Sequence, residues 1–149
     1  MPGLEDLYRE IILDHYRSPR QRGELPTPPA TMTEGFNPLC GDEIKLYVIV
    51  DNGIVTDIKF AGQGCSISQS SASMMTAALK GKSLADARAL LHRFKSMMNG
   101  EEYDSTNAEA CKVRLGDLEA LKGVVKFPVR IKCATLAWNT FAQALDEAT

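Results

Sequence analysis

Apolar and polar residues alternate through the stretch IKLYVIVDNGIVTDIKFA, which runs from Ile44 to Ala61. Successive side chains of a β-strand point to opposite faces, so the alternation predicts two half-buried strands, residues 44–50 and 54–61. The Asp51-Asn52-Gly53 sequence between them consists of residues that are common in turns. The stretch therefore predicts an antiparallel hairpin with one apolar face.

The length of the hairpin turn determines which side chains share that face. A two-residue turn, 52–53, would set Val50 opposite Val55 and would put Asp57 and Lys59 on the apolar face. A three-residue turn, 51–53, with Gly53 left-handed, avoids this conflict. We predict the three-residue turn, and the predicted apolar face then contains Ile44, Leu46, Val48, Val50, Ile54, Ile58 and Phe60.

Helical patterns surround the hairpin. An amphipathic helix opens the chain and ends near Ser18-Pro19, and a proline-containing arm follows it. A capping-box pattern at residues 66–69 predicts a helix over residues 66–79, and a similar pattern at Ser83 predicts a second helix to Met98. The apolar stripe of this second helix consists of Leu84, Ala87, Leu91, Phe94 and Met98. A short helix is predicted over residues 117–122, and a last one begins at Pro128. Residues 100–115 are polar and irregular. Helices on one face of a small antiparallel sheet make an α+β fold.

The composition bounds the class of protein. A chain of 149 residues with 44% hydrophobic and 24% charged residues fits one soluble globular domain, which we assign to residues 1–149. The net charge of −2 gives no reason to expect nucleic acid or a membrane surface as a partner. Charged residues interrupt the opening segment, so we expect no signal peptide. Four cysteines then indicate a reducing compartment, by default the cytoplasm.

The cysteines fall at different places on this outline. Cys40 precedes the first hairpin strand, Cys65 lies between the second strand and a helix, and Cys133 lies in the first turns of the last helix. Thiols at helix N-termini or beside basic residues deprotonate readily, so Cys65 and Cys133 are candidate thiolates. Cys111 lies in the polar segment and is not expected to be a ligand. Because no C-x-x-C pair is present, spacing alone gives only weak support for a metal site and leaves buried structural thiols open as the alternative.

The motif Cys40-Gly41-Asp42 has two interpretations. Gly41 gives the backbone freedom for Cys40 and Asp42 to turn toward one point, as two metal ligands would. Gly and Asp are also ordinary turn residues, so a tight strand-entry turn explains the same motif. On the eight residues NPLCGDEI, 37–44, alone, the turn is the favoured interpretation.

Three ordered motifs resemble a known family. Cys40-Gly41-Asp42, the run from Gly62 to Ser68 and the run from Phe127 to Cys133 are similar to the U-type iron–sulfur cluster assembly proteins, the IscU, SufU and NifU N-terminal family. The resemblance covers essentially the whole chain. It implies an α+β fold with a third strand near residues 31–35, packed against helices. It also implies a shared metal- or cluster-binding site made of Cys40, Asp42, Cys65 and Cys133.

Departures from the scaffold members of that family favour one branch. Lys132 stands where IscU-type scaffolds carry a histidine, and residues 127–130 replace their chaperone-recognition segment. The stretch between Cys65 and Cys133 is also longer. These features resemble the SufU branch, whose members are regarded as zinc-dependent sulfur acceptors for a cysteine desulfurase. The resemblance thus implies Zn²⁺ as the cofactor, a desulfurase as the partner, and downstream iron–sulfur assembly or apo-proteins as recipients.

The chemistry of this interpretation is consistent. Three thiolates and a carboxylate fill a tetrahedral Zn²⁺ site and leave excess negative charge, which Arg130 and Lys132 would offset. By resemblance to SufU, the persulfide acceptor is Cys40, and Cys133 is the second candidate. The protein would act as a sulfurtransferase only together with its desulfurase, with no stand-alone catalysis.

Three other classes of function stay open. The cysteines Cys40, Cys65 and Cys133 would equally ligate a [2Fe–2S] cluster in a scaffold that transfers it to apo-proteins. A cysteine-nucleophile enzyme is disfavoured, because neither His15 nor His92 lies in a motif with a candidate thiol. A purely structural zinc domain would carry the metal without any effect on a desulfurase.

Overall fold

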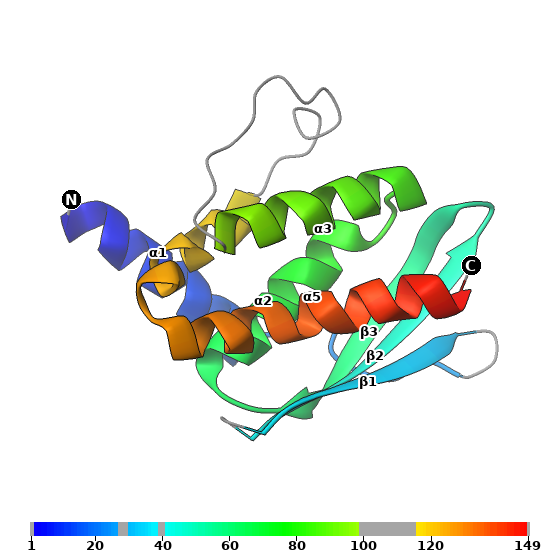
Figure 1. Cartoon of the computed structure of the whole chain (residues 1–149), viewed down its shortest axis with the longest axis horizontal. Helices are drawn as coiled ribbons and strands as arrows, with labels where there is room; N and C mark the ends of the chain where they lie inside the picture. Colours follow the sequence, from blue (N-terminus) through cyan, green and yellow to red (C-terminus); the bar gives the residue numbers. More distant parts are fainter. Residues whose placement is uncertain (1, 27–29, 39–40, 99–115, 149) are drawn as a thin grey trace.

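The computed structural model describes residues 2–26, 30–38, 41–98 and 116–148 (Figure 1). The elements are, in order, helix α1 (Pro2–Arg17), strands β1 (Thr31–Asn37), β2 (Asp42–Asp51) and β3 (Ile54–Gln63), helices α2 (Ser66–Leu79) and α3 (Leu84–Met98), the 3₁₀ helix η1 (Gly116–Lys126) and helix α5 (Pro128–Ala148). The strands form one antiparallel sheet in the order β1-β2-β3. Figure 1 shows the helices gathered on one side of this sheet, which confirms the predicted α+β fold.

The predicted elements agree with the observed ones in most places. The opening helix, the third strand and the helices that begin near Ser66, Ser83 and Pro128 are confirmed. At Ser83 the predicted cap is present, since its Oγ accepts a hydrogen bond from the Asp86 N–H at 3.2 Å. At α2 the capping-box prediction is wrong, because the N-cap is Cys65 and makes no side-chain cap bond. Among the described residues, no helix is both long and apolar enough to cross a membrane.

Several sequence predictions cannot be compared with the structure, and one is extended by it. The polar segment 100–115, which contains Cys111, lies outside the described residues, as do Cys40 and residues 27–29 of the proline arm. The short helix predicted over residues 117–122 is part of the longer η1.

The hairpin turn differs from the predicted one. Asp51 pairs with Ile54, so the turn contains only Asn52 and Gly53, with φ of 54° and 73°. The predicted three-residue turn is therefore wrong. A register shift between Ile49 and Val50 leaves Thr56 of β3 without a cross-strand partner on β2. This β-bulge restores the apolar face that a two-residue turn alone would have broken.

The buried face of the hairpin is close to the predicted one. Leu46 pairs with Phe60 and Val48 with Ile58, and all four side chains are buried, as is Ile44. Near the turn, Val55 is buried in place of Ile54, which is 41% exposed. The bulge explains this exchange. Between the bulge and the turn, each side chain of β3 points to the face of the sheet opposite to the predicted one.

The apolar face of the sheet packs against a helical layer. Helix α5 crosses β1 and β2, while α2 lies against β3 and between α1 and α5. Trp138 of α5 stacks on Phe94 of α3, with ring centroids 4.3 Å apart. The predicted stripe of α3 is confirmed at Ala87, Phe94 and Met98, but Leu90 rather than Leu91 is fully buried.

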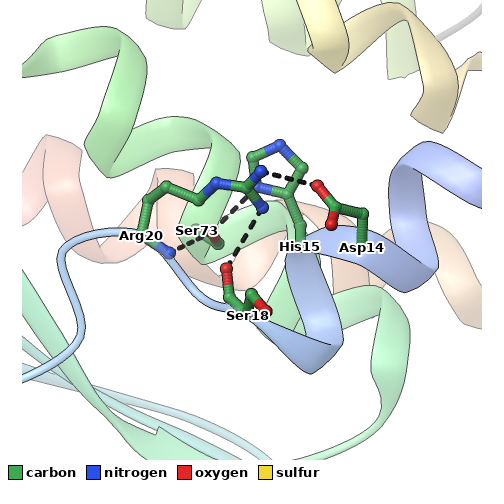
Figure 2. Close-up of polar contacts among 5 residues, drawn as sticks. All are labelled: Asp14, His15, Ser18, Arg20 and Ser73. Carbon is green, nitrogen blue, oxygen red and sulfur yellow. Dashed lines mark hydrogen bonds and ion pairs between the residues drawn. The ribbon is translucent and has the colours of Figure 1, made fainter.

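Helix α1 is attached to α2 through a buried polar contact. Figure 2 shows His15 and Arg20 beside Ser73. The Nδ1 atom of His15 lies 2.8 Å from Ser73 Oγ, and the backbone N–H of Arg20 donates to the same oxygen at 2.8 Å. Outside this contact, the Arg20 guanidinium donates to Asp14 and lowers the pKa of that exposed carboxyl. His15 is therefore buried against α2, and Ser73 fixes the end of α1 over α2.

Replacing Ser73 by Ala should lower the free energy of unfolding by about 1–3 kcal/mol, because it removes the buried oxygen that two polar groups contact. Urea unfolding followed by circular dichroism measures the change. Ser18→Ala is the matched control, since Ser18 is exposed and only its carbonyl contacts Arg20. Equal stability of the two variants would contradict the role of Ser73.

Candidate metal centre

Asp42, Cys65 and Cys133 come together at one end of the sheet. Each offers one ligand atom, and these three atoms lie within 4.8 Å of one another. Asp42 and Cys133 are fully buried, whereas Cys65 is half-buried. The structure thus brings together the three predicted ligands that it describes; Cys40, the fourth, lies outside the described residues.

The alternation of strand β2 places Asp42 in the interior. Asp42 is the first residue of β2 and lies on the same face as Ile44 and Leu46, which pack against the helices. Gly41, directly before it, has φ of 68°, so this position uses the backbone freedom that the sequence predicted. The carboxylate of Asp42 is therefore held at the end of the apolar core, out of solvent.

The starts of two helices place the cysteines. Cys65 is the N-cap of α2 and has an extended backbone (φ −71°, ψ 168°). Its N–H donates to Asp42 Oδ1 at 2.9 Å, so the carboxylate is bound to the start of α2. Cys133 lies in the first turns of α5, and its Sγ is 3.9 Å from the carbonyl oxygen of Val129. Both thiols thus face the end of the sheet where Asp42 lies.

Ser71 connects the two helices that carry these cysteines. Its hydroxyl donates to the carbonyl of Ala134, next to Cys133, at 2.6 Å. The same oxygen accepts a hydrogen bond from Trp138 Nε1 at 3.1 Å. All three residues are buried, so these hydrogen bonds fix the position of α2 relative to α5. They thereby help to set the distance between the thiols of Cys65 and Cys133.

Gly64 leaves the space that the carboxylate occupies. Its φ is +159°, and a Cβ atom there would lie 2.4 Å from Asp42 Oδ1 and 2.6 Å from Ser68 Oγ. Ser68 Oγ is itself bound to the Cys65 carbonyl, 3.1 Å away. Any larger residue would therefore push Asp42 out of its place, so glycine is required by close approach as well as by backbone conformation.

Asn37 is the polar residue of this region that the sequence reasoning missed. It is 6% exposed, and its Nδ2 lies 3.4 Å from Asp42 Oδ2 and 3.8 Å from Cys133 Sγ. The predicted third strand ended at residue 35, two residues before the observed end of β1. Extending that strand in antiparallel register would have placed Asn37 directly opposite Asp42.

A pocket of about 690 Å³ opens beside Cys65, between α1, α2, η1 and the start of α5. Its walls are largely apolar and include Ile12, Leu13, Ile67 and Val124. Arg9, Lys126 and Arg130 also line it, and among the described residues no acidic side chain does. At its rim, Phe127 is 61% exposed. The pocket is thus an apolar hollow with a positive rim that reaches one candidate ligand.

The two predicted supporting cations are both on the surface. Arg130 and Lys132 are exposed, and Arg130 lines the pocket beside Cys65. Within the described ranges, no hydrogen bond or ion pair joins Lys132 to Asp42, Cys65 or Cys133. Electrostatic support of the site by Arg130 and Lys132 therefore stays a prediction.

The chain belongs to the NifU-like N terminal domain family, which matches residues 7–134. It is 48% identical over 143 residues to the zinc-dependent sulfurtransferase SufU of Bacillus subtilis (strain 168), covering 96% of this chain and 92% of that protein. It is 44% identical over 145 residues to the iron–sulfur cluster assembly scaffold protein IscU of Streptococcus pyogenes serotype M1, covering 97% and 86%.

Solved structures agree with this membership. A candidate iron–sulfur cluster assembly scaffold protein for the SUF system of Fervidobacterium islandicum AW-1 superimposes with a TM-score of 0.80 at 33% identity, covering 91% of this chain and 94% of that one. A NifU-like protein (N-terminal) from Brucella abortus has the same fold, with a TM-score of 0.82 at 21% identity, covering 97% and 95%.

The donor set of the site fits Zn²⁺. Zinc is bound by cysteine sulfur and carboxylate oxygen, and in a tetrahedral site its ligand atoms lie roughly 3.3–3.8 Å apart. The three ligand atoms here lie within 4.8 Å of one another, so they are gathered closely enough to share one ion after a small closure. The described residues supply three donors, and Cys40 remains the predicted fourth.

Replacing Gly64 by Ala should weaken zinc retention roughly 10–100-fold, the usual cost of disturbing groups that orient metal ligands, because the new Cβ displaces Asp42. Competition with a chromogenic chelator measures the affinity. Gly81→Ala is the matched control, since Gly81 also has positive φ (86°) but would place its Cβ in open space. Comparable zinc affinity in both variants would show that the clash at Gly64 does not matter.

Proposed function

We propose that this protein is a zinc-bound sulfur acceptor of iron–sulfur cluster assembly. It would take persulfide sulfur from a cysteine desulfurase and pass it on to downstream assembly proteins or apo-proteins. The observation that carries the proposal is the convergence of Asp42, Cys65 and Cys133 within 4.8 Å, at the positions of the three family motifs. Similarity to the zinc-dependent sulfurtransferase of Bacillus subtilis supports zinc as the metal.

Asp42, Cys65 and Cys133 would hold the metal, with Cys40 as the fourth ligand. Bound Zn²⁺ keeps cysteine ligands deprotonated and, with four protein ligands, leaves no position for water. The chain itself excludes water from one side of the site, since Asp42 and Cys133 are fully buried. On the other side Cys65 borders the pocket, so a partner would reach the site from there.

The proposed sulfur transfer is a thiolate–persulfide exchange. The Cys40 thiolate attacks the outer sulfur of the desulfurase persulfide, a new S–S bond forms at Cys40, and the S–S bond in the desulfurase breaks. The desulfurase cysteine leaves as a thiolate, so one S–S bond replaces another and no oxidant is consumed. Cys133 is a poor acceptor, because its side chain is fully buried and an incoming persulfide could not reach it.

The pocket supplies a chemically suitable contact for the desulfurase. Its apolar walls and its three cations fit a segment that carries acidic and large apolar side chains. The exposed side chains of Phe127 and Val129, 61% and 59% exposed, extend the apolar surface beyond the rim. We therefore propose that the desulfurase docks on this face, beside Cys65.

Metal content and desulfurase assays together test the proposed function. Isolated protein should contain about one Zn²⁺ per chain, typical of a thiolate-rich site, and should be colourless. It should stimulate a cysteine desulfurase, and mass spectrometry should then find additional sulfur on Cys40. Cys40→Ser should abolish stimulation, whereas Cys111→Ser should keep it. A brown, zinc-free protein would instead indicate the alternative, a scaffold that holds a [2Fe–2S] cluster on Cys40, Cys65 and Cys133.

Reversing a charge at the pocket should weaken docking without loss of the metal. Lys126→Glu should raise the protein concentration needed for half-maximal stimulation of the desulfurase, because the rim would then repel an acidic segment. The effect should shrink at high salt. Lys45→Glu is the matched control, since Lys45 is exposed on β2, away from the pocket lining. Identical titration curves for the two variants would exclude the pocket as the docking site.

A further inference from the structure

We infer that Asn37 is a positioning residue of the metal site. Its carboxamide holds Asp42 and Cys133 as a fixed half of the site, which would keep the metal bound while the proposed acceptor thiolate, Cys40, reacts. The inference rests on the proposed zinc site and adds to it a residue outside the four predicted ligands.

The strand register brings Asn37 to the site. Asn37 ends β1 and is the cross-strand partner of Asp42, which begins β2. Residues at such paired positions have their side chains on the same face of the sheet. Here that face is the interior one, since Asn37 is 6% exposed and Asp42 is fully buried. Helix α5 covers β1 and brings Cys133 to the same carboxamide.

The chemistry of the carboxamide matches its two neighbours. An asparagine NH₂ group has two donors, and ionised Asp42 and a Cys133 thiolate are both acceptors. Nδ2 lies 3.4 Å from Asp42 Oδ2 and 3.8 Å from Cys133 Sγ, so one nitrogen faces both. Turning the amide over would place its oxygen against two anionic groups. The site charge therefore fixes the amide orientation, and the amide in turn fixes the two ligands.

Asp42 is consequently held at both oxygens. Oδ1 accepts from the Cys65 N–H at 2.9 Å and Oδ2 accepts from Asn37. Each oxygen keeps a further lone pair for a metal, so these bonds orient the carboxylate without blocking it. Rotating or withdrawing Asp42 would break a hydrogen bond to a buried group, which is costly. Asp42 is thus a fixed ligand of the site.

Cys65 lies in a different environment. It is half-buried, it borders the pocket, and within the described part of the chain its Sγ makes no hydrogen bond. Cys65 thus lacks the support that Asn37 gives to Asp42 and Cys133. The buried half held by Asn37 would keep the metal in place while the proposed acceptor thiolate, Cys40, reacts.

The test compares zinc release from the zinc-loaded full chain and from Asn37→Leu, which keeps the branched shape of the side chain but removes both donors. Release to a chromogenic chelator should be roughly 10–100-fold faster in the variant, as for other residues that orient metal ligands. The absorption bands of the Co²⁺-substituted protein should also shift, because they report ligand geometry. Iodoacetamide should modify Cys65 before Cys133 in the wild type, and this order should be lost in Asn37→Leu.

Thr33→Val is the matched control, because Thr33 is buried on the same face of β1. The Thr33→Val variant should have a lower free energy of unfolding but the same rate of zinc release as the wild type. Asn37→Ser, whose shorter side chain cannot reach both acceptors, should accelerate release in the same direction and serves if Asn37→Leu does not fold. The role of Asn37 would be overturned if both Asn37 variants released zinc at the wild-type rate, or if Thr33→Val accelerated release as much as they do. Either result would leave the proposed zinc site itself standing. Wild-type protein that retains neither Zn²⁺ nor Co²⁺ would overturn the proposed site as well.

Discussion

The hydrogen bond from the Cys65 N–H to Asp42 Oδ1 joins the sheet to the helical layer at the point where both carry candidate ligands. It connects the first residue of β2 to the N-cap of α2, which are 23 positions apart in the chain. A buried carboxylate is stable only where polar partners replace water. This bond supplies one such partner, and Gly64 keeps the space around it open. The positions of the two residues are therefore interdependent.

Helix α2, whose N-cap is Cys65, is linked to other helices by further buried hydrogen bonds. It is buried from Ser68 to Thr76, yet this part carries many hydroxyl groups, which are costly to bury unless they are hydrogen-bonded. Ser71 bonds to α5, and Ser73 contacts the end of α1. Among the described residues, every buried side-chain nitrogen and oxygen has a hydrogen-bond partner. The helix that begins at Cys65 is thus held by directional bonds as well as by apolar packing, which suits an element that must present a thiol at a defined place.

The two sides of the candidate metal centre differ in a way that relates to function. On one side Asp42 and Cys133 are enclosed by β1, β2 and α5, and Asn37 lies against both. On the other side Cys65 meets a pocket with a positive rim. The proposed sulfur acceptor would have to keep its metal while a thiolate reacts. The buried half, with two ligands held by Asn37, would meet that need, and the pocket beside Cys65 would give a partner access to the site.

The sequence by itself located most of the elements and, through the resemblance of its motifs to a known family, a candidate ligand set. Strand alternation located the hairpin, apolar stripes located the helices, and three motifs indicated Asp42, Cys65 and Cys133, because each of these signals lies within a few adjacent residues.

Three features required the tertiary structure. The bulge at Thr56 combines a two-residue turn with one apolar face, and the helices cover that face. Asn37 reaches Asp42 through strand register, and Cys133 through the packing of α5. The pocket beside Cys65 is assembled from α1, α2, η1 and α5. Local patterns are set by neighbours in the chain, whereas the distances between ligands, orienting residues and pocket walls depend on packing between segments that are far apart in sequence.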